Sequence, residues 1–125
     1  MEDKLQRKNA TLDFIDTINI KDIPKLYKII TLCGSTKFKD IFDKINLEAT
    51  LDNRIILQPG CYAHFDNIII TDEEKIKLDL LHKEKIKMSN CIIVVNKNNY
   101  IGESTKTEIE YALINNIPIY YYFIY

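Results

Sequence analysis

The residues with the clearest chemical potential lie in two short turns, each of which follows an apolar run. The first turn follows residues 29–32 and consists of Cys33, Gly34, Ser35, Thr36 and Lys37. Glycine permits a tight turn and a close ligand approach, and the helix expected next points free N–H groups at the turn. With two hydroxyl groups and a lysine ammonium, this turn is suited to bind a phosphate or sugar hydroxyls. The alternative is an ordinary tight turn with a helix cap.

The second turn, residues 101–108, follows the apolar run 91–95 and contributes a carboxylate, Glu108. If Ser104 caps the following helix, Glu108 occupies its fourth position, near the positive end of the helix dipole. This position predicts a lowered pKa and an ionised carboxylate, as a nucleophile requires. An anion-binding turn facing a carboxylate indicates chemistry on a nucleoside or nucleotide. The alternative is that Glu108 is exposed and merely stabilised by the dipole.

Both turns need a scaffold that brings them to one edge, and an alternation of strands and helices supplies it. Strands are expected at 27–32, 54–57, 91–95 and 119–124, with helices over about 35–51, 72–88 and 105–115. Thr71 and Glu74 form a capping box at the start of the second helix. The pattern predicts an α/β fold: a flavodoxin-like three-layer sandwich with a mainly parallel sheet of four or five strands, ordered 2-1-3-4. Ligands bind at the carboxyl edge of such a sheet.

We divide the chain into an N-terminal arm, residues 1–27, and one domain, residues 28–125. The arm carries enough apolar residues to dock on another surface, and Pro24 ends any helix within it. An added edge strand, a short helix and a dimer contact all remain open for the arm.

The two turns, "LCGSTKF" and "GESTKTEIEYA", resemble those of the nucleoside 2-deoxyribosyltransferases and the related deoxynucleoside-monophosphate N-glycosidases. The resemblance covers residues 28–122. It implies that the Cys33 turn binds sugar or 5′-phosphate, and that Glu108, within the matching segment 104–112, attacks the anomeric carbon. The implied reaction is similar to retaining glycoside hydrolysis through a glycosyl-enzyme. The resemblance also implies a homodimer or higher homo-oligomer, for which residues 119–125 and the arm are candidate contacts.

The sequence departs from this family at the residue that would protonate the departing base. The family places an aspartate on the helix before the third strand, and this position falls on His82 here, with Asp79 one helical turn earlier. Either residue is a candidate acid/base. Alternatively, His82 is a packing residue and the chain is a non-catalytic nucleotide-binding module that senses or sequesters a nucleotide.

Further ligand-binding residues are expected in loops at the same edge. Tyr62 stacks on a nucleobase and His64 hydrogen-bonds it, unless the loop aromatics simply cover the core. Asn96 follows the third strand and is placed to bind sugar hydroxyls, beside Gly102 and Ser104 of the second turn.

Composition excludes several other partners. The net charge of −1 and pI of about 6.1 provide no basic surface for a nucleic acid polymer or an acidic membrane. No apolar stretch approaches the ~20 residues of a membrane span. Composition therefore argues against a nucleic acid polymer and a membrane, and the ligand expected from the two turns is a small nucleoside or nucleotide.

The cysteines and histidines indicate neither a disulfide framework nor a metal site. Cys33, Cys61 and Cys91 have no CxxC spacing, and His64 and His82 show no paired-ligand spacing. We therefore expect reduced thiols in a cytoplasmic protein, with no metal and no cofactor. A helix N-terminus would lower the pKa of Cys33, but the sequence places no partner base beside it, which disfavours a nucleophilic role.

Overall fold

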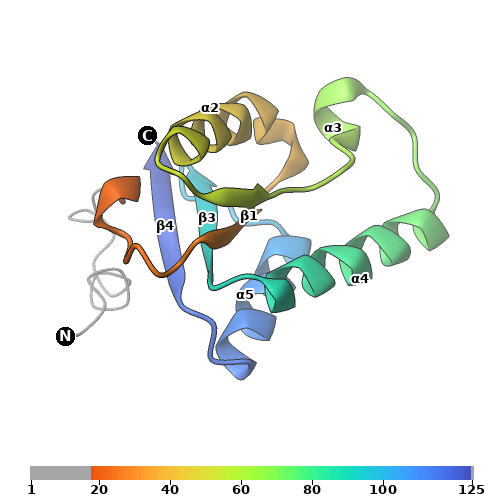
Figure 1. The fold of residues 1–125 in the computed structure, drawn as a ribbon. Helices are drawn as coiled ribbons and strands as arrows, with labels where there is room; N and C mark the ends of the chain where they lie inside the picture. The colour runs from red at the N-terminus through yellow and green to blue at the C-terminus, as the bar shows by residue number, and fades with distance from the viewer. Residues whose placement is uncertain (1–17, 125) are drawn as a thin grey trace.

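A computed structural model describes residues 18–124, which form an α/β fold around a parallel sheet (Figure 1). The described residues contribute four strands, β1 (Ile29–Cys33), β2 (Ile55–Leu57), β3 (Cys91–Lys97) and β4 (Ile119–Ile124). All three strand pairings are parallel, and the order is β2-β1-β3-β4. The predicted flavodoxin-like fold class and the predicted strand order are both confirmed.

Helices cover both faces of the sheet and complete three layers (Figure 1). The helical segments are η2 (Ile20–Asp22), η3 (Thr36–Phe38), α2 (Lys39–Leu51), α3 (Ala63–Asp66), α4 (Asp72–Met88) and α5 (Glu103–Ile114). Helix α2 packs on one face, while α4 and α5 pack together on the other. Among residues 18–124, no helix is both long enough and apolar enough to cross a lipid bilayer.

The helix starts agree with the sequence in one case and differ in two. Thr71 and Glu74 form the predicted capping box of α4, with both reciprocal hydrogen bonds present. The helix expected from Ser35 instead begins with the separate 3-10 turn η3. The N-cap of α5 is Gly102 rather than Ser104, so Glu108 is the sixth helical residue and not the fourth.

Side-chain alternation along the strands separates the two larger core clusters, and a third, small one surrounds Phe123. Ile30 and Leu32 of β1 face α2, whereas Cys33 belongs to the cluster with Ile86 of α4 and Ala112 of α5. This alternation decides the position of Cys33, which turns toward the two helices that carry the other candidate catalytic residues.

The described part of the N-terminal arm is folded onto the domain. Ile20 and Ile23 are buried in the α2-side cluster, and η2 ends before Pro24 as expected. The backbone N–H of Ile18 donates to the carbonyl of Tyr121 on β4. Residues 1–17 lie outside the described residues, so the predictions for them are untested.

Candidate functional site

A cavity of about 540 Å³ opens at the carboxyl edge of the sheet, where the sequence predicted a ligand site. Its walls come from the turn after β1, the segment 59–70, the inner side of α4 and the first turns of α5. Ser35 and Glu108 both line this cavity. The two turns recognised in the sequence therefore face a common space.

Gly34 is required by the backbone of the first turn. Its φ is +149°, and a Cβ atom there would lie 3.1 Å from Phe42 Cζ and 3.2 Å from the Val95 carbonyl oxygen. Both the conformation and the close packing therefore favour glycine. The next two residues present hydroxyl groups: Ser35 Oγ accepts the N–H of Lys37 at 3.4 Å, and Thr36 Oγ1 lies 2.9 Å from His64 Nδ1.

Glu108 reaches the cavity because it belongs to the buried stripe of α5. Thr105, Glu108 and Ala112 are the buried residues of that helix, and Glu108 is 7% exposed. Burial, with repulsion from Asp79, raises its pKa to about 7. The predicted low pKa is wrong: at the sixth position the helix dipole acts weakly, and loss of hydration outweighs it.

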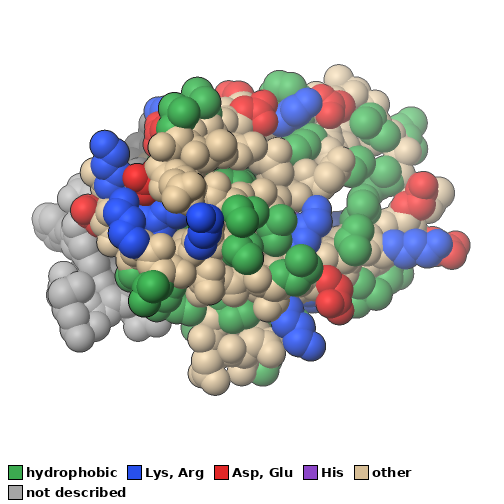
Figure 2. Space-filling view, viewed as in Figure 1, with side chains coloured by type: hydrophobic (Ala, Val, Ile, Leu, Met, Phe, Trp, Pro, Cys, Tyr) green, Lys and Arg blue, Asp and Glu red, His purple; other side chains and the backbone are tan. Residues whose placement is uncertain are grey.

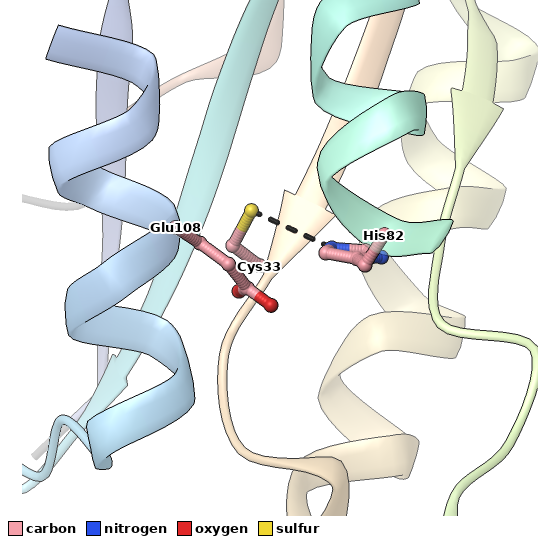
Figure 3. A group of neighbouring side chains, drawn as sticks. All are labelled: Cys33, His82 and Glu108. Atoms are coloured by element: carbon pink, nitrogen blue, oxygen red, sulfur yellow. Dashed lines mark hydrogen bonds between the residues drawn. The ribbon is translucent and has the colours of Figure 1, made fainter. Parts of the chain in front are cut away.

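Cys33 lies beside Glu108 and His82, the two residues of this group that line the cavity (Figure 3). Its sulfur lies within 4.8 Å of a carboxylate oxygen of Glu108 and 3.6 Å from Nε2 of His82. Burial and the negative charge of Glu108 raise the pKa of the Cys33 thiol, so the predicted lowering is wrong. The expectation that no base lies beside Cys33 is also wrong, because the packing of α4 and α5 places His82 and Glu108 next to it.

His82 and Asp79 project from α4 with different surroundings. Burial, reinforced by the charge of Lys85, lowers the pKa of His82 to about 4, so its ring is neutral at pH 7. Asp79 lies nearer the solvent; its carboxylate accepts from Ser104 Oγ at 3.5 Å and lies 3.6 Å from Lys75 Nζ. The cavity thus places two carboxylates in electrostatic contact, one buried and one partly hydrated.

Four predicted binding residues lie outside the cavity lining: Cys33, Lys37, Tyr62 and Asn96. Lys37 Nζ sits 3.8 Å from the centre of the Tyr100 ring, so it does not serve the first turn as an anion-binding cation. Tyr62 is a core residue whose ring packs on Phe42, which corrects its expected stacking role. Asn96 is buried within β3, and its Oδ1 has no hydrogen-bond partner among the described residues.

The remaining predicted residues, His64, Gly102 and Ser104, do line the cavity. Two lysines that sequence reasoning missed also line it. Lys75 Nζ donates to Ser104 Oγ at 2.8 Å, and Lys85 Nζ donates to the Gln58 carbonyl at 2.7 Å. The i,i+4 spacing of Lys75 and Asp79 could have indicated that Lys75 lines the cavity with Asp79, because such pairs share one helix face.

An apolar wall, also missed, flanks the polar end of the cavity. It consists of Ile68, Ile69, Ile70, Leu78 and Leu81. Ile69 is 96% exposed and Leu81 is 57% exposed. Figure 2 shows hydrophobic side chains on the face over α4 and the segment between α3 and α4, with charged residues among them.

Cys33, His82 and Glu108 also form a group of metal-ligating side chains. Their ligand atoms all lie within 4.8 Å of one another, and all three residues are buried. The expectation that no such group exists depended on sequence spacing, whereas these residues come from β1, α4 and α5. Comparison of the sequence with protein-family models and with curated proteins finds no match.

Proposed function

We propose that this protein cleaves or transfers the N-glycosidic bond of a (deoxy)nucleoside or nucleoside monophosphate, with Glu108 as the nucleophile. The observation that supports this most directly is the common cavity lined by the Glu108 carboxyl group and the Ser35 turn. A sugar held at that turn would present its anomeric carbon to the space in front of the carboxylate. The attack forms a glycosyl ester and releases the base, and water or a second base then breaks the ester.

Asp79 is the better candidate for the residue that directs a proton to the departing base. His82 is neutral at pH 7 and therefore carries no imidazolium proton to donate. Asp79 lies at the more hydrated side of the same cavity, where Ser104 and Lys75 orient its carboxylate. In this scheme a water molecule held by Asp79 protonates the base as it leaves, and Asp79 afterwards takes a proton from the attacking water and returns it to solvent.

The cavity walls suit the parts of a nucleoside. The apolar wall offers a flat contact for a nucleobase, with Ile68 and Ile69 at its edge. Ser35 and Thr36 offer hydroxyl groups for the sugar or a 5′-phosphate, and Lys75 offers a positive charge in place of Lys37.

The experiment that tests this proposal is release of free base from a panel of nucleosides and mononucleotides, followed by chromatography. We expect turnover by the wild type and at least a ~10³-fold loss in Glu108→Gln, since the nucleophile is removed. Glu110→Gln is the matched control, because Glu110 is on the same helix and exposed. Equal rates for Glu108→Gln and the wild type would refute the mechanism.

A non-catalytic nucleotide-binding module is the second candidate. The observation that favours it is the low pKa of His82 at the position of the family's aspartate, which leaves that position without a proton donor at pH 7. Calorimetry separates the two candidates: saturable binding of a nucleotide recovered unchanged supports sensing or sequestration, and release of base supports the enzyme.

We also propose that the chain acts as a homo-oligomer in the cytoplasm. The contact candidates are residues 119–125 and the arm, as the resemblance to the deoxyribosyltransferases implies. The described cysteines, Cys33, Cys61 and Cys91, are free thiols, as suits a reducing compartment. Light scattering tests the assembly, and a monomer at all concentrations would refute it.

A further inference from the structure

A buried group of three potential metal ligands is formed by Cys33, His82 and Glu108. Hydrogen bonding alone does not require these three side chains to be buried together. A thiol, an imidazole and a carboxylate converge from β1, α4 and α5, and their exposed fractions are 0%, 6% and 7%. Figure 3 shows the three side chains directed into one space between the two helices and the end of β1. Burying three such groups together costs free energy that a bound cation would offset.

We propose that these three residues bind a zinc ion, with the fourth coordination position open to the cavity. A sulfur–zinc bond of about 2.3 Å and a nitrogen–zinc bond of about 2.1 Å at a tetrahedral angle place the two ligand atoms about 3.6 Å apart. The Cys33 Sγ to His82 Nε2 distance is 3.6 Å. The two ligand atoms are therefore already at the separation that tetrahedral zinc requires.

Glu108 completes the set with a small adjustment. Its oxygen lies within 4.8 Å of the other two ligand atoms, so rotation of a flexible side chain brings it to bonding position. The Cys33 thiol proton is released to solvent when zinc binds, because the thiolate is the ligand. His82 and Glu108 both line the cavity, so an ion held by them is accessible from it.

The donor types select zinc over harder cations. Mg²⁺ and Ca²⁺ prefer oxygen ligands alone, whereas a thiolate and an imidazole with one carboxylate are typical of zinc. Zinc at this position would occupy the carboxylate that the proposed reaction uses as nucleophile. Zinc binding and glycosidic cleavage therefore exclude one another, and zinc would inhibit the enzyme.

The test is a zinc titration of the untagged full-length chain after treatment with a chelator, read by competition with a chromophoric zinc indicator. We expect one zinc per chain in the wild type. Cys33→Ala, Cys33→Ser and His82→Ala should each weaken binding by more than the about 10–100-fold that outer-shell changes cost. Cys61→Ala is the matched thiol control and should bind zinc as the wild type does, since Cys61 is outside the group.

Two further measurements keep the result independent of folding and of activity. Cobalt replaces zinc as a probe, and a thiolate-to-cobalt absorption band should appear in the wild type and be absent in Cys33→Ser. Glu108→Gln nearly preserves the shape of the side chain. Its circular dichroism spectrum should therefore be that of a folded protein, while its affinity for zinc should be lower. Absence of saturable zinc binding, or unchanged binding in Cys33→Ser, would overturn the proposal. Failure of base release would leave these metal measurements unaffected.

Discussion

The Cys33 sulfur lies within 4.8 Å of a carboxylate oxygen of Glu108, across the junction between the end of β1 and α5. Each group changes the other: the carboxylate raises the pKa of the thiol, and the thiol opposes the rise in the pKa of the carboxylate. We therefore expect Cys33 to act as a positioning residue for Glu108 rather than as a nucleophile. This relationship makes the protonation of Glu108 sensitive to a single substitution on another element.

The first prediction concerns the pH dependence of base release in buffer that contains a chelator. Only ionised Glu108 attacks, so kcat/KM should rise with pH and level off above an apparent pKa of about 7. Cys33→Ala removes a thiol that lowers the pKa of Glu108, so the rise should move to higher pH. Cys61→Ala should leave the apparent pKa near that of the wild type, and an unmoved profile in Cys33→Ala would contradict the positioning role.

The second prediction concerns stability and does not depend on activity. The pKa of Glu108 in the folded protein, about 7, is above its ordinary value of 4.5. The folded state therefore holds this proton more tightly, and the contribution is complete below about pH 4.5 and lost as pH rises through about 7. The loss is on the order of 3 kcal/mol in the free energy of unfolding.

Glu108→Gln removes this titration while keeping the shape of the side chain. We expect urea unfolding to show the variant as more stable than the wild type at pH 8, with the difference shrinking by pH 5. Glu110→Gln, at an exposed position, should show no such change with pH. A Glu108→Gln difference that is the same at both pH values would show that burial does not perturb the carboxyl group.

The third prediction concerns the first turn. Gly34→Ala should reduce the free energy of unfolding by about 1–3 kcal/mol, because a Cβ would press on Phe42 and Val95 at a strained φ. Gly60→Ala is the matched control, since its Cβ would meet only Lys85 Nζ at 3.9 Å. Thermal or urea unfolding measures both, and equal stability of the two variants would contradict the role assigned to Gly34.

The fourth prediction concerns the attachment of residues 18–27. The buried guanidinium of Arg54 donates to the carbonyls of Ile20, Ile23, Pro24 and Tyr27. Arg54→Lys cannot serve all of these acceptors, so we expect a loss of about 2–4 kcal/mol and faster amide exchange at 18–27.

Lys25→Ala is the control for Arg54, because it removes only an ion pair between Asp52 and a side chain that is 68% exposed. Such a pair contributes about 0–1 kcal/mol. Unchanged amide exchange at 18–27 in Arg54→Lys would show that other contacts hold this segment.

The sequence by itself determined the strand order, the start of α4 and the edge at which the cavity opens. These features follow from short-range signals: apolar runs, a capping box at Thr71 and Glu74, and a glycine turn after β1. Tertiary packing decided which side chains enter the cavity. A helix turns about 100° per residue, so residues three or four apart lie on the same face. Helix α5 begins after Gly102 and buries the face that carries Thr105, and Glu108 is buried because it lies on that face.

The same physical reason explains the residues that the sequence misplaced. Lys37 and Tyr62 are next to the expected ligand edge in sequence, yet the packing of Phe38, Tyr100 and Phe42 turns them elsewhere. The Cys33, His82 and Glu108 group has no signature in spacing, because its members meet only when β1, α4 and α5 pack together. Local patterns determine the elements, and the contacts between elements determine the protonation and the partners of the residues they carry.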